Sequence, residues 1–278
     1  MKNRIINSLL FLVVMTAFGA CALEKTIELD LKQTEKKLII DALLTDSPDK
    51  TPYVILSNTV DFYTTGRTPR VSDADVVIVD NLGNEFVMEE QEDAPGVYTN
   101  DFRGVIGRTY TLSVTYEGQI YESTETLARV TAIDSLTWSI DPDELEDPED
   151  EGYFYEMLLY TTEPTETEDF YLFKFYRNDS IMNFDGEGVF FSDDEYLSEN
   201  IEGVTGPGYY REGDKGTMEM YSMSRSGFVY FQDMDMNLNN DGGMFGPIPA
   251  NSRNNLSNGA LGFFLVSAVS IDSIRIGE

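Results

Sequence analysis

The chain has 278 residues, with 50 acidic against 19 basic side chains, no histidine and one cysteine. A formal net charge of −31 repels nucleic acid and anionic lipid, so we expect neither as a partner. The lack of histidine and of a second thiol excludes Ser–His–Asp and Cys–His catalysis, which leaves carboxylate pairs or lysine as the available chemistry.

Residues 1–20 have the pattern of a signal peptide. A positively charged start and a short apolar stretch are followed by Gly19, Ala20 and Cys21. The apolar stretch is shorter than the roughly 20 residues that a spanning helix needs. Small residues before a cysteine suit a lipoprotein signal peptidase, and the thiol carries the lipid. We expect cleavage before Cys21, acylation of that residue and a polar tether over residues 21–36. An ordinary signal peptide with a chance cysteine is the alternative.

Residues 37–130 have the pattern of short strands separated by turns. Over residues 110–116 apolar and polar side chains alternate, which predicts a strand with one buried face, and Glu117-Gly118 predicts a hairpin to a return strand at 120–126. We predict no helix of ordinary length here, and the spacing favours an immunoglobulin- or transthyretin-like β-sandwich. The shorter strands are predicted at 38–44, where Asp41 interrupts an apolar run, at 53–56, 75–80 and 85–88, with turns at 81–84 and at Pro95-Gly96.

Residues 131–278 are predicted to form a second β-rich domain with long loops. An aromatic strand is expected at 170–176, followed by a turn at 177–180, and weak periodicity over 185–215 predicts long loops with one short helix. Phe228, Tyr230 and Phe231 are expected in the core of strands, although aromatic rows also serve as sugar-stacking platforms. Residues 141–152 carry eight carboxylates and two prolines, which predict an exposed loop or linker, with calcium binding as the alternative.

A second group of possible calcium ligands precedes Gly242-Gly243. Oxygen-bearing side chains at alternate positions open an EF-hand loop. Counted from either of the first two aspartates, however, no glycine stands at the sixth position and no glutamate at the twelfth. A polar surface loop is therefore the preferred interpretation, and calcium is the alternative. The candidate ligands are Asp233, Asp235, Asn237, Asn239 and Asp241.

Several short motifs together resemble Bacteroidota lipoproteins of the family named domain of unknown function 4249 (DUF4249). Such proteins open with a lipidated cysteine and an apolar strand, continue through three strand and turn motifs, and close with an Asn- and Gly-rich motif. The order and spacing of these motifs extend over nearly the whole mature chain. The matching segments here are 37–44, 74–83, 95–98, 107–114, 247–251 and 255–264.

The resemblance implies a lipid-anchored outer-membrane protein, on the periplasmic or the cell-surface face, because members resemble accessory proteins of TonB-dependent transporters. We therefore expect a non-enzyme without a cofactor, which binds or helps to assemble a TonB-dependent β-barrel transporter. An adhesin or structural surface protein is the first alternative, and a carboxylate-based glycan-active enzyme is the second.

The closing motif itself has two interpretations. Asn258-Gly259 suits a type I′ turn into a buried strand over 260–269, which would make the motif structural. Alternatively, the motif is a docking surface for the transporter, formed by Asn255, Asn258, Gly259, Gly262, Phe263 and Phe264.

Overall fold

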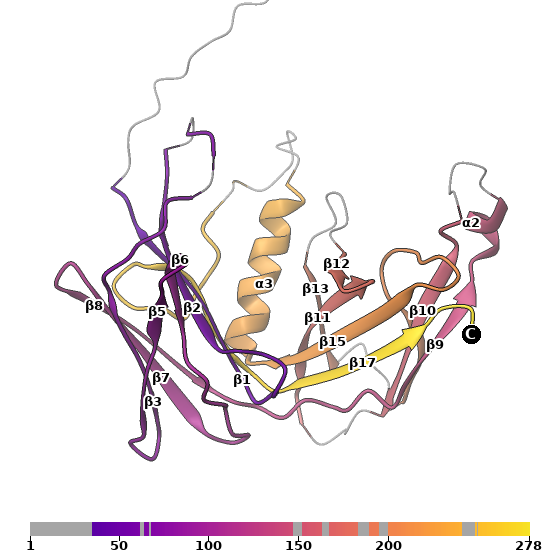
Figure 1. The fold of residues 1–278 in the computed structure, drawn as a ribbon, viewed down its shortest axis with the longest axis horizontal. Coiled ribbons are helices and arrows are strands. Elements are labelled where there is room, and N and C mark those ends of the chain that lie inside the picture. Colours follow the sequence, from indigo (N-terminus) through magenta and orange to yellow (C-terminus); the bar gives the residue numbers. More distant parts are fainter. Residues whose placement is uncertain are drawn as a thin grey trace, which may run out of the picture. The chain divides into compact units, whose positions relative to one another are not determined.

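The computed structural model describes residues 35–278, except for 62–63, 67, 147–151, 163–166, 183–188, 195–199, 241–247 and 249. The predicted signal peptide, Cys21 and most of the predicted tether lie outside the described residues. Within the described part, none of the helices has the length and apolarity needed to cross a membrane. The predicted fold class is confirmed, because the chain is mainly β and its sheets pack in pairs (Figure 1).

Two sheets form the first sandwich. Its core contains Ile40 and Leu44 from one sheet and Ile78 and Leu112 from the other, all fully buried. Sheet A has the strand order β16 (Leu261–Ser267), β1 (Leu38–Thr45), β2 (Tyr53–Asn58), β6 (Ala94–Thr99) and β5 (Glu89–Gln91). Sheet B has the order β4 (Glu85–Val87), β3 (Asp75–Asp80), β7 (Thr109–Tyr116) and β8 (Gln119–Thr126).

The turns of the first sandwich follow the sequence with one exception. Glu117 and Gly118 join β7 to β8 with positive φ at both residues, as a type I′ hairpin requires. The predicted turn at Pro95-Gly96 is wrong, because both residues lie inside β6 and the turn precedes them. Gly96 has φ +77° and lies beside a register shift between β5 and β6. This glycine therefore allows a β-bulge within the strand and does not end it.

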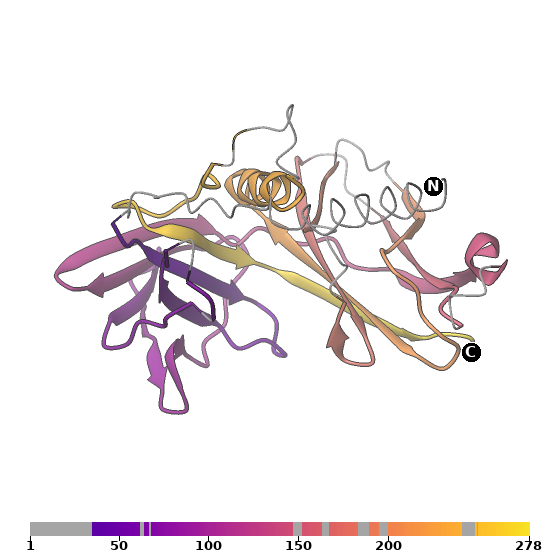
Figure 2. The ribbon, with the colours of Figure 1, turned by 90° about the horizontal axis from the view of Figure 1, so that it is seen from above.

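Strand β16 joins the two halves of the chain. It pairs in parallel with β1, with Ala42 opposite Phe264, so a C-terminal strand completes the first sandwich. Only Ala268 separates β16 from β17 (Val269–Arg275), which belongs to another sheet, and Figure 2 shows this path as one long yellow ribbon. The expected division into a sandwich at 37–130 and an independent domain at 131–278 therefore does not describe β16.

The second sandwich lies between sheets C and D. Its core includes Met157 and Leu159 from sheet C and Phe175 and Met218 from sheet D. Sheet C has the order β14 (Asn200–Thr205), β10 (Tyr155–Thr162) and β9 (Ser135–Ile140). Sheet D has the order β12 (Ser180–Ile181), β11 (Phe170–Arg177), β15 (Lys215–Met223) and β17, and β13 (Phe190–Asp193) also pairs with β11.

Two loop predictions need correction. The acidic segment contains a short exposed helix, α2 (Pro142–Glu146), and it connects β9 to β10, which pair with each other. It is therefore an exposed connection within sheet C, which agrees with the first predicted alternative, and not a linker between domains. The stretch 185–215, expected to hold loops and a short helix, contains strands β13 and β14 among its described residues.

Helix α3 (Arg225–Leu238) covers a third apolar cluster, between the outer face of sheet A and sheet D. The helix begins after Ser224, whose Oγ accepts a hydrogen bond from the Gly227 N–H at 3.2 Å. Its aromatic side chains pack against residues such as Leu43 and Leu172. The prediction that these aromatics belong to strands is wrong, although their packing against the core agrees with the prediction.

Candidate functional site

The predicted calcium ligands are distributed along helix α3. Asp233, Asp235 and Asn237 are helical, Asn239 is the C-cap, and Asp241 lies outside the described residues. The preferred interpretation as a surface loop is therefore wrong. In an α-helix, residues two apart point roughly 200° away from each other around the axis, so alternate side chains do not converge on one ion.

Asp233 is already paired with a basic side chain. Its two carboxylate oxygens accept hydrogen bonds from the Arg253 guanidinium at 2.7 and 2.8 Å. The Arg253 hydrogen bond holds the pKa of Asp233 below its usual range, in spite of an opposing effect of burial. Within the described residues no group of three or more acidic side chains is arranged to hold a metal ion. The helix carboxylate thus anchors the segment that leads into β16.

The closing motif, residues 255–264, is bound into the first sandwich. The Asn255 side chain accepts from the Phe264 N–H at 3.1 Å and donates to the Phe264 carbonyl at 3.0 Å and to Glu125 at 2.9 Å. Asn258 donates to the Ile120 carbonyl on β8. The motif therefore holds the edge of β16 and the end of β8 together.

The two glycines of the motif have different roles. Asn258 and Gly259 have φ of 54° and 74°, which agrees with a type I′ turn into the strand. Gly262 has φ +102°, and a Cβ there would lie 2.0 Å from the Ile40 carbonyl oxygen of β1. Phe263 and Phe264 are buried, on opposite faces of sheet A. These contacts favour the structural interpretation of the motif.

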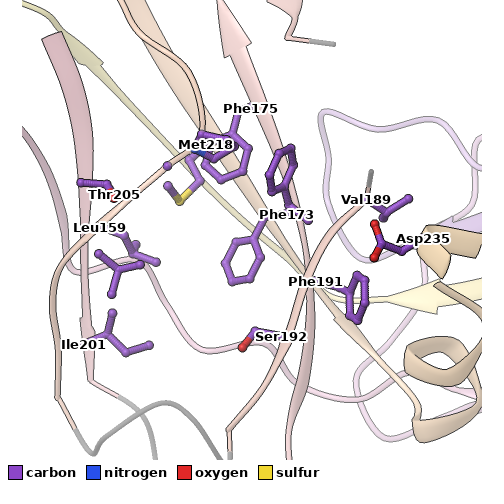
Figure 3. A pocket seen from close by; sticks show the side chains of 14 residues that line it. Leu159, Phe173, Phe175, Val189, Phe191, Ser192, Ile201, Thr205, Met218 and Asp235 are labelled. Atoms are coloured by element: carbon purple, nitrogen blue, oxygen red, sulfur yellow. The ribbon is translucent and has the colours of Figure 1, made fainter. Parts of the chain in front are cut away.

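An aromatic pocket opens between sheets C and D. It has a cavity volume of about 420 Å³, within the usual range for ligand pockets. Phe173 and Phe175 line it from β11, and Figure 3 shows Phe173 between Leu159 on one side and Phe191 on the other. Phe175 packs edge-on against Phe190 at 5.6 Å between ring centroids. Among the described lining residues, Asp235 is the single titratable side chain.

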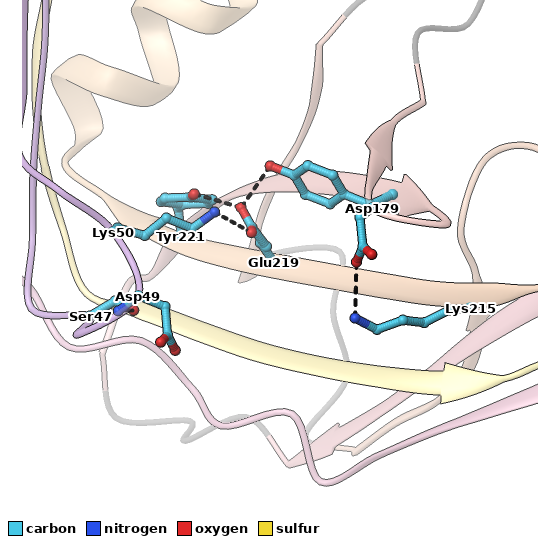
Figure 4. A network of polar contacts seen from close by, with 8 residues as sticks. Ser47, Asp49, Lys50, Asp179, Lys215, Glu219 and Tyr221 are labelled. Carbon is cyan, nitrogen blue, oxygen red and sulfur yellow. Dashed lines mark hydrogen bonds and ion pairs between the residues drawn. The ribbon is translucent and has the colours of Figure 1, made fainter.

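A polar network surrounds Glu219 on β15 (Figure 4). One carboxylate oxygen binds the Lys50 ammonium, and the other accepts from the hydroxyls of Tyr176 at 3.0 Å and Tyr221 at 2.7 Å. The Glu219 side chain is 6% exposed, so these partners replace its water. Burial and the Glu219 charge raise the pKa of both tyrosines above the usual range, so both remain donors at neutral pH.

Sequence reasoning did not identify this network. Lys50 comes from the connection between β1 and β2, and Glu219 lies some 170 positions later, so only tertiary structure brings them together. A usable indication was present on β11, the strand that pairs with β15, where Lys174 interrupts an otherwise aromatic run and lies opposite Glu219. A charged side chain in such a run is usually paired with an opposite charge or contacts a ligand, because burying an unpaired charge is costly.

The family model described as domain of unknown function (DUF4249) matches residues 24–272, and the chain belongs to this family. No curated protein matches the chain. Among solved structures, a two-domain fibronectin type III segment of chicken tenascin is 13% identical, covering 68% of this chain and 91% of that chain at a TM-score of 0.20. A DUF4785 family protein of Legionella pneumophila is 9% identical, covering 66% of this chain and 52% of that chain at a TM-score of 0.23.

Proposed function

We propose that the protein is a non-catalytic outer-membrane lipoprotein, anchored through Cys21, that binds a TonB-dependent transporter as an accessory or assembly partner. The observation that carries this proposal is the wall of the aromatic pocket. Its described lining offers four phenylalanine rings and one carboxylate, which suits the binding of an apolar group and not acid–base chemistry.

The surroundings of Glu219 support the same proposal against a glycan-active enzyme. A carboxylate-based glycosidase needs two acids on either side of the scissile bond, one of them free to act as base or nucleophile. Both oxygens of Glu219 already accept hydrogen bonds, and the side chain is buried. The network therefore suits stabilisation of the contact between the two sandwiches.

The test is co-purification of the tagged full-length protein from detergent-solubilised outer membranes. We expect a TonB-dependent transporter to be recovered with the native chain. Val204 lines the aromatic pocket and is 49% exposed, so Val204→Glu should place a charge at the pocket with little effect on folding and reduce the recovered transporter. The matched control is Val87→Glu on β4, because Val87 is 58% exposed and does not line the pocket.

Recovery that is equal for both variants would reject the pocket as the docking site. Consistent absence of a transporter with the native chain would reject the accessory role and favour an adhesin or structural protein. The anchor has its own test, since Cys21→Ser should release the protein from membranes and abolish incorporation of labelled fatty acid.

A further inference from the structure

A second cavity lies beside the β11–β12 hairpin of the second sandwich. It has a volume of about 460 Å³ and shares no described lining residue with the aromatic pocket. Its walls come from the segment before β10, from the hairpin and from the connection between β14 and β15. Among the described lining residues, Arg177 at the end of β11 is the single charged side chain. The cavity is large enough for a small organic molecule.

The hairpin fixes the position of Arg177. Asn178 and Asp179 have φ of 50° and 65°, as a two-residue type I′ turn requires. Arg177 and Ser180 are therefore directly opposite each other on the two strands, with their side chains on the same face. One guanidinium nitrogen of Arg177 donates to the Tyr209 carbonyl at 2.9 Å, which ties the hairpin to another wall of the cavity.

A tyrosine ring holds the same guanidinium. The guanidinium carbon of Arg177 lies 4.4 Å from the centroid of the Tyr153 ring, and that of Arg211 lies 3.8 Å from the same centroid. Both are cation–π contacts. Arg177 is thus fixed by a ring and by a carbonyl group, neither of which neutralises its charge.

Arg177 has no carboxylate partner in the part of the chain that the structure describes. The acids of the adjacent turns have other donors. Asp179 pairs with Lys215 at 3.0 Å (Figure 4). Asp214 accepts a hydrogen bond from the Asn178 side chain at 2.6 Å. A guanidinium has five N–H donors in a planar fork that matches a carboxylate. The one hydrogen bond that the protein forms with it leaves donors for a ligand.

We propose that this cavity binds a small organic monocarboxylate. Arg177 receives the carboxylate through two parallel hydrogen bonds, and the Ser180 hydroxyl donates to the same group. Ile181 and Met182 line the space for an apolar body of the ligand. A single charge is favoured, because the net charge of −31 repels every further negative charge on a ligand. The site does not depend on a transporter partner.

The test is fluorine NMR of the detergent-purified full-length protein with para-fluorobenzoate, after subtraction of the signal from micelles alone. The comparison ligand is para-fluorobenzamide, which has the same ring and no charge. We expect saturable broadening of the para-fluorobenzoate signal, none of the para-fluorobenzamide signal, and no displacement by an equal concentration of inorganic phosphate. Absence of para-fluorobenzoate binding, equal binding of both ligands, or displacement by phosphate overturns the proposal.

Substitution of the arginine tests its role. Arg177→Gln should weaken binding of para-fluorobenzoate about tenfold or more, because hydrogen bonds between charged groups are lost. The matched control is Arg275→Gln on β17 of the same sheet. Arg275 also donates to a backbone carbonyl, that of Gly213 at 2.9 Å, and does not line the cavity. If the two variants bind the ligand equally, the assignment of Arg177 is wrong and the proposal falls.

A second pair of variants keeps Arg177 and its contacts. Ser180 is exposed and opposite Arg177, so Ser180→Glu places a carboxylate beside the guanidinium with little effect on folding. This carboxylate should occupy the arginine and prevent binding of para-fluorobenzoate. Ser180→Gln, which has the same size and no charge, should retain most of the binding. Equal binding by these two variants overturns the proposal, whether or not Arg177→Gln folds.

Discussion

Replacing Gly262 with alanine should separate β16 from β1. The backbone at Gly262 has φ +102°, a conformation that L-residues with a side chain rarely adopt. An added Cβ would lie 2.0 Å from the Ile40 carbonyl oxygen and 2.8 Å from the Ile40 carbonyl carbon. Both are backbone atoms of the neighbouring strand, so no rotation of a side chain relieves the contact.

Two costs add up in this variant. Positive φ costs a residue with a Cβ about 1–2 kcal/mol, and forced repacking of a well-packed interior costs about 1–3 kcal/mol. The expected loss is roughly 2–5 kcal/mol out of the 5–15 kcal/mol typical of a folded protein. For a chain of this size, 1 kcal/mol corresponds to a change in Tm of roughly 2–4 °C.

The assay is thermal and urea unfolding followed by circular dichroism. The matched control is Gly259→Ala in the same motif, because Gly259 also has positive φ (+74°) but open space around its Cβ position. The control should show only the conformational cost, about 1–2 kcal/mol. If Gly262→Ala were no less stable than Gly259→Ala, the close pairing of β16 with β1 would be refuted.

Three further predictions concern stability. Asn255→Ala should cost roughly 2–4 kcal/mol in chemical unfolding, because it leaves both backbone groups of Phe264 without the amide that they bind. Hydrogen bonds from Asn84 hold the pKa of Asp80 below its ordinary 3.8, against an opposing effect of burial. The ionised Asp80 carboxylate should therefore stabilise the fold above about pH 4, and this stabilisation should be lost as the pH falls further. We expect the unfolding free energy of Asp80→Asn to depend less on pH in this acid range than that of the native chain. A fragment of residues 36–130 should show no cooperative unfolding in circular dichroism, and the same fragment joined by a flexible linker to residues 252–268 should regain it, because β16 supplies the missing strand of sheet A.

Much of the first sandwich follows from local sequence pattern. The alternation over 110–116 and the run at 75–80 become β7 and β3 with nearly the predicted ends, because each strand buries one face against a single core. The Glu117-Gly118 turn is equally local, since two positive φ values are needed there. In such segments the local preference and the tertiary packing agree.

Helix α3 shows where local reasoning fails. The segment contains Gly227 and β-branched and aromatic residues that favour strands, and its acidic residues alternate as a loop motif would. Its helical state depends on the Ser224 cap and on packing of its aromatic face in the third cluster. That cluster is assembled from strands distant in sequence, so no window of sequence contains the information.

The same limit applies to the candidate site. Lys50 and Glu219 are each recognisable in the sequence only as charged residues, and their contact depends on the crossing of the chain between sheets A and D at Ala268. That crossing requires β16 to leave the second half of the chain and pair with β1. Parallel pairing of strands more than 200 positions apart has no local signature.

The closing motif therefore carries information about the fold more than about a partner. The polar groups of the Asn255 side chain are engaged by Phe264 and Glu125, and Asn258 donates to β8, so a transporter that used these amides would have to break contacts of the first sandwich. Position 262 requires glycine because a Cβ there would collide with the Ile40 carbonyl oxygen, and this requirement does not depend on a partner. Side chains that the fold does not need can bind a partner without loss of internal contacts. Val204, which is exposed and lines the aromatic pocket, is such a side chain. A transporter contact should therefore respond to substitution at Val204 and tolerate changes in the motif that leave the first sandwich folded.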